Sequence, residues 1–280
     1  MKRIAILATA LALVAPVQAQ TIDKIKSSKT VTIAHRVDSL PFSFDQNGEK
    51  LGYTVDICKR IVASLEQQLK ISGLSIKWVA ATAQNRMELV AKRQADMECG
   101  ATTVTLGRME KVDFSSLVFV DAGALMVRTE SNIKTLADLA EKKVAVIGGT
   151  TTEAALTGTL KQRLVNARII TVKTREEGLA ALEAGSADAF ASDTLLLAGL
   201  AAKAKDPSKL SLVAGDPFSI EPYAIVLPRG DWEFRLAVNR ALSQIYRSGD
   251  IKQIFDKYFG QIGSPTPLLM ATYVLNSFSE

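Results

Sequence analysis

The sequence predicts an α/β protein with two lobes, and three observations support this fold class. Strand-like and helix-like segments alternate along residues 31–101, a pattern typical of a parallel sheet with helices on its faces. The same alternation restarts after residue 122. Two stretches, 118–123 and 218–223, have the position of crossings between the two units. Two crossings predict a cleft between the lobes, which is where ligands usually bind.

The first unit is predicted to begin with a short strand and an amphipathic helix. Residues 31–34 alternate in polarity as a strand does. The helix predicted over residues 56–69 has one apolar face, formed by Ile57, Ile61, Val62, Leu65 and Leu69. The segments that follow are predicted as a strand, a helix and a strand, at residues 75–79, 85–93 and 96–101.

The second unit and the C-terminal part continue this alternation. After residue 122, helices are predicted at residues 135–140, 153–164, 175–184 and 193–202, and strands at residues 144–147, 168–172 and 187–191. Near the C-terminus, a strand at residues 223–227 precedes helices at residues 231–247 and 250–258, which Gly249 separates. We expect residues 20–119 and 223–280 to form a large lobe, on which the apolar stretch 268–274 packs, and residues 120–222 to form a small lobe.

The first 19 residues have the layout of a secretory signal peptide. Lys2 and Arg3 form a basic head, residues 4–14 are apolar, and residues 17–19 form a small-residue cleavage site. The apolar run is shorter than the roughly 20 residues that a membrane-spanning helix needs. A buried N-terminal helix is the alternative interpretation. We expect cleavage near Ala19 and a soluble, exported mature chain.

Composition and charge argue against several classes of function. Removal of Lys2 and Arg3 lowers the formal net charge from +5 to +3, and no block of Lys and Arg suggests a nucleic-acid partner. One His and two Cys are too few for a usual zinc site, and we expect neither a metal nor a cofactor. Cys58 and Cys99 lie on different predicted elements, and the sequence leaves a disulfide and two buried thiols equally open.

A glycine turn that leads into a predicted helix is a candidate for anion binding. Residues 148–152 connect a predicted strand to the helix expected from Glu153. Free N–H groups and the positive end of the helix dipole suit a carboxylate or a phosphate there, and Thr150 and Thr151 add hydroxyl donors. The Lys of a P-loop is missing. Plain capping of the helix by Thr explains this segment equally well.

Three arginines, Arg36, Arg86 and Arg108, fall at predicted strand ends or helix starts, where open α/β sheets bind ligands. A guanidinium holds a carboxylate through two charge-assisted hydrogen bonds, although a solvated surface charge is the alternative for any single Arg. Thr103 would add a hydroxyl and an amide near Arg108. Asp193 either caps its predicted helix or binds an ammonium group. Several arginines with one aspartate fit a zwitterion that carries an extra negative charge, such as glutamate or aspartate.

The sequence offers no obvious catalytic machinery. His35 is the only histidine, so a Ser-His-Asp triad would have to use it, and the G-x-S-x-G motif does not occur. Neither cysteine is flanked by a usable His, and most Asp and Glu residues fall on predicted helix surfaces. We therefore expect a binding protein rather than an enzyme, with His35 in a structural role.

The order and spacing of several segments resemble the periplasmic amino-acid-binding proteins of ABC importers, solute-binding protein family 3, and especially their glutamate/aspartate-binding branch. The segments are His35-Arg36 to Pro41-Phe42-Ser43, Gln84-Asn85-Arg86, Glu98-Cys99-Gly100-Ala101-Thr102-Thr103, Gly149-Thr150-Thr151, Ala189-Phe190, Leu195 to Gly199 and Phe255 to Phe259. The resemblance covers essentially the whole mature chain. It implies a type II periplasmic-binding-protein fold whose lobes close on the ligand about a hinge. It further implies a periplasmic monomer that binds an amino acid and delivers it to the permease subunits of an ABC importer.

The resemblance also implies how a ligand is held. Thr103 and Arg108 would bind the α-carboxylate, Thr151 would help from the other lobe, and Asp193 would take the α-ammonium. In the acidic branch Arg36 and Arg86 would face the side-chain carboxylate. A charged carboxylate needs a cation there, whereas a neutral amide does not.

Three positions depart from the acidic branch. Ala83 and Ala101 each stand where the branch has a Ser, although the backbone of Ala101 would still be able to bind. Arg175 stands where the branch has a His. It would add positive charge at the side-chain end of the site, and a surface helix cap is its alternative role. A longer or phosphorylated ligand is therefore open, as is the choice between glutamate and aspartate and between the L and D forms.

Three rival functions remain at this point. A cyclohexadienyl dehydratase-like enzyme on the same fold would use the arginines to hold a dicarboxylic substrate such as prephenate, but no acid/base group is evident for it. A binding protein for another polar amino acid, such as glutamine, would keep the fold and the transport role. A sensor domain of a signalling receptor ranks last.

Overall fold

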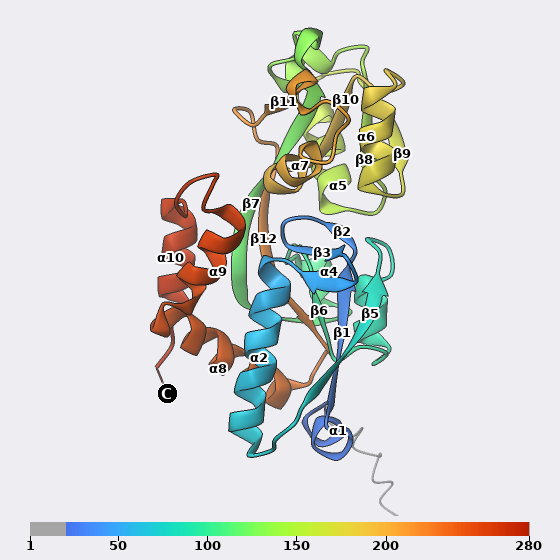
Figure 1. Ribbon diagram of the computed structural model, residues 1–280. Coiled ribbons are helices and arrows are strands. Elements are labelled where there is room, and N and C mark those ends of the chain that lie inside the picture. Colours follow the sequence, from blue (N-terminus) through green and yellow to red (C-terminus); the bar gives the residue numbers. More distant parts are fainter. Residues whose placement is uncertain (1–20, 280) are drawn as a thin grey trace, which may run out of the picture.

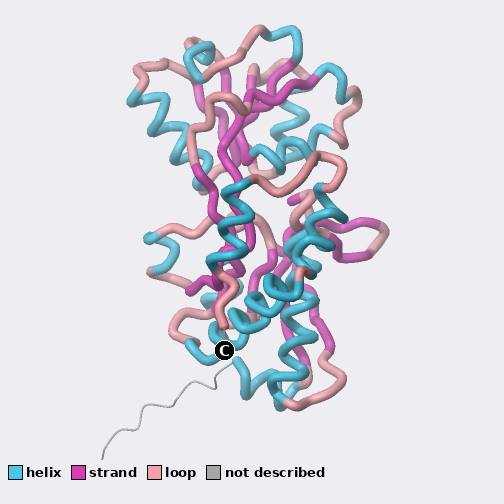
Figure 2. Tube along the Cα trace, turned by 90° about the vertical axis from the view of Figure 1, so that its left-hand side faces the viewer, coloured by secondary structure: helices cyan, strands magenta, loops and turns pink. Residues whose placement is uncertain are grey.

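The computed structural model describes residues 21–279, so the predicted signal peptide lies outside the described residues. Figure 1 shows two lobes joined by two strands, β7 (Asp113–Arg128) and β12 (Ile220–Leu227). The view turned by 90° shows strands passing from one lobe to the other near the middle of the molecule (Figure 2). The chain therefore has the two-lobed α/β architecture that its sequence predicts.

The large lobe contains a main sheet, a small sheet and seven of the described helices. The strands of the main sheet that belong to this lobe alone are β1 (Thr30–Arg36), β5 (Ser75–Ala81) and β6 (Met97–Cys99). The small sheet consists of β2 (Asp38–Ser39), β3 (Ser43–Gln46) and β4 (Glu49–Leu51). The helices are α1 (Thr21–Ser28), α2 (Tyr53–Leu69), α3 (Arg86–Ala91), α4 (Leu106–Met109), α8 (Trp232–Ser248), α9 (Asp250–Phe259) and α10 (Pro267–Leu275).

The small lobe places helices on both faces of its strands. Its strands are β8 (Lys143–Ile147), β9 (Arg168–Val172), β10 (Ala189–Asp193) and β11 (Leu210–Val213). Its helices are α5 (Thr151–Gln162), α6 (Arg175–Glu183) and α7 (Thr194–Ala201), with short 3₁₀ turns η1 (Thr129–Ser131), η2 (Leu136–Leu139) and η3 (Pro207–Lys209).

The strand order explains why each lobe has a buried sheet. The order is β5-β1-β6-β12-β7-β10-β8-β9, with β11 beside β7. Strand β1 pairs in parallel with β5 and β6, and β8 pairs in parallel with β9 and β10. Strands buried on both faces consist of apolar runs, and six consecutive residues of β1 are buried. The carboxyl ends of β1 and β6 in one lobe, and of β8 and β10 in the other, lie where the lobes meet (Figure 1).

The two lobes are connected by an antiparallel strand pair. In the crossing, Ile220 of β12 is opposite Ala122 of β7, and Tyr223 is opposite Phe119. A Cβ atom at Gly123 would lie 2.5 Å from Ser219 Oγ and 2.7 Å from the ring of Phe218, so a larger residue there would force these side chains to shift. The pairing register shifts after Tyr223, so the strand pair is irregular next to the crossing. This pair is the only main-sheet link between the lobes within the described residues, and we call β12 the hinge strand.

Some details of the elements differ from those expected. Strand β7 is 16 residues long and continues through both lobes, whereas the sequence indicated only a crossing at residues 118–123. Strand β10 lies two residues later than expected, because Asp193 completes its pairing with Gly123 of β7. Helix α5 begins at Thr151 rather than at residue 153. Helix α1, the small sheet and β11 were not predicted, because these segments are short and show little apolar periodicity.

The C-terminal apolar stretch forms α10 and packs on the large lobe, as expected. Leu269 is buried, and the Tyr273 hydroxyl lies 2.7 Å from the hydroxyl of Tyr53 in α2. The Ser243 hydroxyl of α8 donates a hydrogen bond to the carbonyl of Asn276 at 3.0 Å. These contacts join the end of the described chain to the core of the large lobe.

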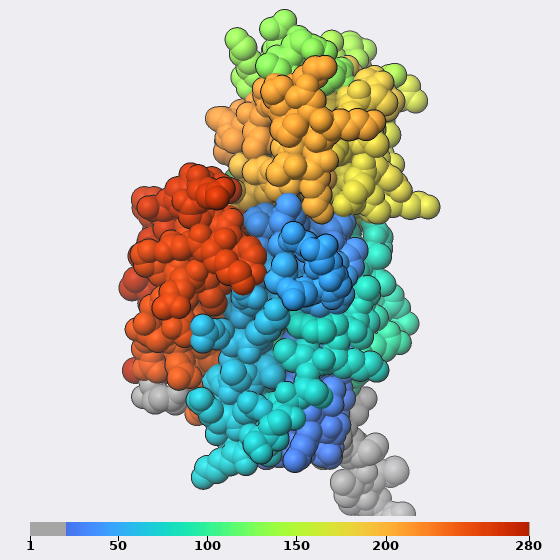
Figure 3. Space-filling view, in the orientation of Figure 1, coloured from blue at the N-terminus to red at the C-terminus, as the bar shows by residue number. Residues whose placement is uncertain are grey.

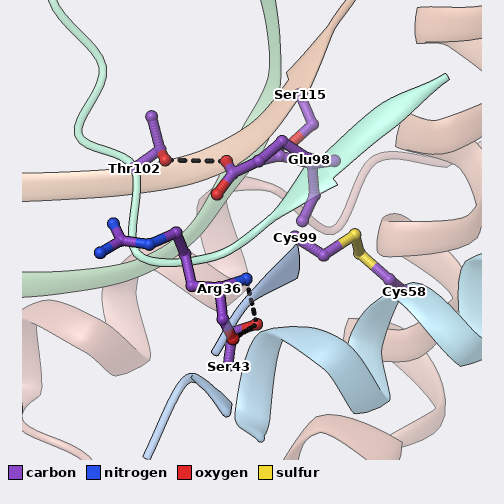
Figure 4. Close-up of a disulfide and its surroundings, with 8 residues drawn as sticks. Arg36, Ser43, Cys58, Glu98, Cys99, Thr102 and Ser115 are labelled. Atoms are coloured by element: carbon purple, nitrogen blue, oxygen red, sulfur yellow. Dashed lines mark hydrogen bonds between the residues drawn. A yellow bond between two sulfur atoms is a disulfide. The ribbon is translucent and has the colours of Figure 1, made fainter. Parts of the chain in front are cut away.

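A disulfide joins Cys58 of α2 to Cys99 of β6, with their Cα atoms 6.4 Å apart (Figure 4). Both cysteines are fully buried, and 41 positions separate them in the sequence. The cross-link ties the long helix α2 to the strand that is followed by residues 100–103. It therefore restrains the backbone from which several of the predicted ligand-binding residues project.

We expect the double variant Cys58→Ala and Cys99→Ala to lose about 2–4 kcal/mol of unfolding free energy, because a cross-link over a loop of this length restricts the unfolded chain. Urea unfolding of the variant and of the oxidised wild type measures the difference. Wild-type protein with its disulfide reduced is the control for lost side-chain packing. Equal stability of oxidised and reduced wild type would contradict the prediction.

Candidate functional site

A polar cavity lies between the lobes, and eight of the nine predicted ligand-binding residues line it. The eight residues are Arg36, Arg86, Ala101, Thr103, Thr150, Thr151, Arg175 and Asp193. The wall is completed by Ala83, Ile147, Thr152, Ala191 and Ser192. Residues that are far apart in the sequence are thus brought together at the carboxyl ends of β1, β6, β8 and β10. Arg108, the ninth, lies behind Thr103.

Arg36 is the last residue of β1 and is almost completely buried. Its Nη2 atom donates hydrogen bonds to both carboxylate oxygens of Asp38, at 2.7 and 3.0 Å. Burial is the main cause that lowers the pKa of Arg36 to about 10, and the neighbouring Arg175 adds to the effect. A pKa of about 10 still leaves Arg36 positively charged at neutral pH.

Arg86 is the first residue of α3 and is also buried. Its Nη1 atom donates a hydrogen bond to the Ala101 carbonyl at 2.9 Å, so this backbone oxygen already has a partner within the protein. Burial lowers the pKa of Arg86 to about 10, and Glu98 partly offsets that change. The guanidinium of Arg86 is therefore held in place by the Ala101 carbonyl, which follows β6.

Arg175 comes from the other lobe, at the start of α6. It is buried, and its Nη1 atom donates to the Ser39 hydroxyl across the cleft at 3.1 Å. The alternative of a surface helix cap is wrong, because the cap of α6 is made by Thr174, whose hydroxyl accepts a hydrogen bond from the N–H of Glu177. Both lobes therefore contribute an arginine to the same cavity.

The three cavity arginines share one unusual property. The Nε atoms of Arg36, Arg86 and Arg175 are buried, and within residues 21–279 none of them has a hydrogen-bond partner. A buried donor without a partner is destabilising, because it has lost its bonds to water. Three such donors at one end of a cavity make that end suited to an anionic group.

Glu98 lies near two of the cavity arginines, Arg36 and Arg86, and was not predicted as a site residue. Its carboxylate is fully buried and accepts a hydrogen bond from the Thr102 hydroxyl at 2.8 Å. Figure 4 shows Arg36 and Thr102 on the same side of Glu98. Burial raises the pKa of Glu98 above its ordinary value, against the opposing effect of Arg86. The sequence signal was its position directly before Cys99 within the strand predicted at residues 96–101.

At the other end of the cavity, two threonine hydroxyls from different lobes meet one carboxylate. Thr103 and Thr151 both donate to Oε2 of Glu221, the latter at 2.8 Å. Arg108 donates from Nη1 to the Thr103 carbonyl at 2.7 Å and so holds this segment in place. Glu221 lies on the hinge strand β12, and the sequence pointed to it only as part of the crossing.

Asp193 does not cap its helix. It occupies the position before α7, but its side chain makes no capping hydrogen bond. Instead its carboxylate accepts hydrogen bonds from the hydroxyls of Thr152, at 2.9 Å, and of Tyr223 on the hinge strand. Of the two roles that the sequence left open for Asp193, capping is therefore excluded.

Thr150 has the capping role that was considered as an alternative. Its hydroxyl accepts a hydrogen bond from the N–H of Glu153 at 3.1 Å and donates to the Ile147 carbonyl at 2.7 Å. Thr151, the next residue, faces the cavity as described above. The Gly148–Thr152 segment thus combines helix capping with a place in the cavity wall.

His35 does not line the cavity between the lobes. It is buried in β1, and its Nε2 atom lies 2.8 Å from Asp45 Oδ1 while its ring packs edge-on against Trp78. These contacts support the structural role predicted for it. Between residues 21 and 279, no group of three or more His, Cys, Asp or Glu side chains is placed to share a metal ion. None of the described helices has both the length and the apolar composition needed to cross a membrane.

Comparison with known families assigns the chain to one of them. Residues 31–261 match the model of the bacterial extracellular solute-binding proteins, family 3. The chain belongs to this family. The family is one of binding proteins found outside the cytoplasm, which agrees with the expectation of a binding protein rather than an enzyme.

Relatives with curated names match most of the chain. The glutamate/aspartate import solute-binding protein of Escherichia coli is 36% identical over 246 residues, which cover 88% of this chain and 81% of that protein. An L-glutamate/L-aspartate-binding protein of Pseudomonas aeruginosa is 36% identical over 243 residues, which cover 86% of this chain and 80% of that protein.

Solved structures of the same fold include two with similar coverage. The cysteine-binding protein of Campylobacter jejuni has a TM-score of 0.75 at 25% identity and covers 88% of this chain and 95% of its own. An ancestral amino acid-binding protein described as a precursor of cyclohexadienyl dehydratase has a TM-score of 0.72 at 28% identity, with 86% and 100% covered.

Asp121 is a buried acid at the hinge whose ionisation affects stability. Its carboxylate oxygens accept hydrogen bonds from the N–H groups of Ala122, at 2.8 Å, and Leu195, at 3.1 Å. Burial, and then the nearby Asp193, raise the pKa of Asp121 from 3.8 to about 7. The folded protein therefore keeps a proton that the unfolded chain releases near pH 4.

We expect the variant Asp121→Asn to gain stability relative to the wild type as the pH rises. Asp121 stabilises the folded state at low pH, and this contribution is lost between about pH 4 and pH 7, after which both states are ionised. Asn cannot ionise, so the difference in unfolding free energy should shift in favour of the variant over that range and then become constant. Urea unfolding of both proteins at a series of pH values measures this difference. A difference that does not change with pH would rule out a raised pKa of Asp121.

Proposed function

We propose that this protein binds an acidic amino acid, glutamate or aspartate, in the periplasm and delivers it to the permease subunits of an ABC importer. One observation supports the choice of an acidic ligand above the others. Three buried arginines from two lobes line one end of the cleft, and each has an Nε donor without a partner among the described residues. The curated names of relatives that are 36% identical agree with this choice.

The proposed ligand lies across the cleft with its two ends in different surroundings. Its side-chain carboxylate contacts Arg36, Arg86 and Arg175, where a charged group gains charge-assisted hydrogen bonds. Its ammonium group is held by Asp193, whose carboxylate is fixed by two hydroxyl donors. This assignment leaves the third group of the ligand, the α-carboxylate, for the opposite wall.

The α-carboxylate is proposed to bind at the segment that contains Thr103 and Thr151, whose hydroxyls would leave Glu221 and donate to the ligand instead. Arg108 supports this segment through the Thr103 carbonyl, and the first turn of α5 adds the positive end of a helix dipole. Thr150 and Ala101 are proposed to contribute their backbone N–H groups. The Thr150 hydroxyl and the Ala101 carbonyl already have partners within the protein. The protein is proposed to act as a monomer.

The division of the chain into lobes follows from the same proposal. We assign residues 20–119 and 223–280 to the large lobe and residues 120–222 to the small lobe, so that both boundaries fall in the crossing of β7 and β12. A rotation about this strand pair would separate Arg175 from Ser39 and open the cleft. Cleavage of the signal peptide near Ala19 is part of the proposal.

We expect Arg86→Gln to weaken glutamate binding about tenfold to a hundredfold more than glutamine binding, because the lost charge-assisted hydrogen bonds are made only by the side-chain carboxylate. Calorimetry on protein stripped of bound ligand by unfolding and refolding measures both affinities.

The matched control for this experiment is Arg108→Gln, which should weaken both ligands equally because it acts near the α-carboxylate common to both. Equal losses of glutamate and glutamine in the Arg86 variant would remove Arg86 from the side-chain end. Tight binding of glutamine with weak binding of both acids would overturn the acidic-ligand proposal itself.

Ligand binding should also close the lobes. In the described structure Gly199 of α7 lies so close to the large lobe that a Cβ atom there would be 2.4 Å from the Leu40 carbonyl oxygen. On the face shown in Figure 3, blue atoms of the N-terminal part of the described chain touch the orange atoms of the small lobe. Closure is driven by ligand contacts that both lobes make together.

We expect saturating glutamate to reduce the radius of gyration measured by small-angle scattering. Gly199→Ala should weaken glutamate binding and diminish the compaction, because its methyl group meets backbone that cannot move aside. Gly158→Ala is the matched control, since nothing lies within 4 Å of the Cβ position there. Unchanged scattering of the wild type with saturating glutamate would refute closure.

A further inference from the structure

Asp38 is a partly buried acid that contacts two of the three cavity arginines without lining the cavity itself. It lies in β2, two residues after Arg36, and its side chain is 12% exposed. Burial alone would raise the pKa of Asp38, but Arg175 and Arg36 together outweigh burial and hold the pKa below its ordinary value. The group is therefore ionised at neutral pH.

Asp38 contacts arginines from both lobes at once. Arg36 of the large lobe donates to both of its oxygens, at 2.7 and 3.0 Å. Arg175 of the small lobe places Nη1 3.5 Å from Asp38 Oδ2. The same Nη1 atom donates to the Ser39 hydroxyl at 3.1 Å, so β2 as a whole meets the start of α6.

Asp38 does not bond to every hydrogen-bond donor of Arg36 and Arg175. It contacts terminal nitrogens of Arg36 and Arg175, while the Nε atoms of both remain buried and without a partner in the described chain. Arg86, the third guanidinium, is bonded to the Ala101 carbonyl and does not contact Asp38. Two protein carboxyl groups, those of Asp38 and the buried Glu98, thus lie beside the three guanidinium groups at this end of the cleft.

We infer that Asp38 is a specificity-determining positioning residue, which sets the side-chain end of the cleft to accept one negative charge and to discriminate against a dianionic group. This inference rests on the proposed function. Asp38 acts through Arg36 and Arg175 and makes no contact with the ligand. A monoanionic carboxylate shares the arginines with Asp38, whereas Asp38 would repel a second negative charge on the ligand.

Two ligands that differ in this charge provide the test. L-glutamate ends in a carboxylate, and O-phospho-L-serine, of nearly the same length, ends in a phosphate that carries a charge of about −1.5 to −2 at pH 7. Calorimetry gives the affinity of each for every variant. The ratio of phosphoserine to glutamate affinity is the measured quantity, because a purely structural defect weakens both ligands and leaves the ratio unchanged.

Four proteins are compared with the wild type. Asp38→Asn removes the negative charge and should raise the ratio roughly tenfold or more, the size expected for one unit charge at close range. Arg175→Gln removes a positive charge and should lower the ratio. The double variant restores the net charge of the pocket, and its ratio should return near the wild-type value. Asp45→Asn is the matched control, since Asp45 lies in the same small sheet and pairs with Lys50 and His35 outside the cavity wall.

Each outcome decides between the two proposals. If the wild type binds glutamate and the ratio in Asp38→Asn stays within about twofold of the wild-type ratio, the role of Asp38 is refuted while the proposed function stands. If the wild type binds neither glutamate nor aspartate, the proposed function fails and this inference fails with it. If Asp38→Asn does not fold, the Arg175→Gln ratio decides, and an unchanged or higher ratio in that variant overturns the inference.

Discussion

Burial of positive charge between the lobes is the constraint around which the cleft is arranged. A guanidinium removed from water is stable only where hydrogen bonds and opposite charges replace its hydration. Arg36, Arg86 and Arg175 are all buried. Arg36 is paired with Asp38, Arg86 with the Ala101 carbonyl, and Arg175 with both the Ser39 hydroxyl and Asp38. These partners leave the Nε donors of all three arginines without a hydrogen bond among the described residues, which is the basis for proposing an anionic ligand.

The division of these groups between two lobes connects binding to motion. Arg175 belongs to the small lobe, whereas its partners Asp38 and Ser39 belong to the large lobe. The same division occurs at the other end, where Thr103 and Thr151 share Glu221 of the hinge strand. On the proposed closure, opening the cleft would break contacts at both ends together, and a ligand that restores charge balance in the closed form would shift the population toward closure.

The fold and much of the site could be predicted from the sequence for separate physical reasons. Parallel strands and their covering helices have strong apolar patterns, and Arg36, Arg86 and Thr151 were found because ligand residues collect at strand ends. The acids Asp38, Glu98 and Glu221 were missed, since a carboxylate looks the same in sequence whether it is solvated or paired with a buried arginine. The length of β7 was also missed, because its middle segment is made of small residues such as Ala122 and Gly123, which have weak strand preference.

The length of β7 has a mechanical consequence. At ~3.3 Å per residue, its 16 residues span about 50 Å, so each half of the strand is a long lever arm on either side of the crossing. A bend too small to break a backbone hydrogen bond near Gly123 is magnified along these arms. We expect this amplification to open the cleft for an amino acid without any part of the strand pair unfolding.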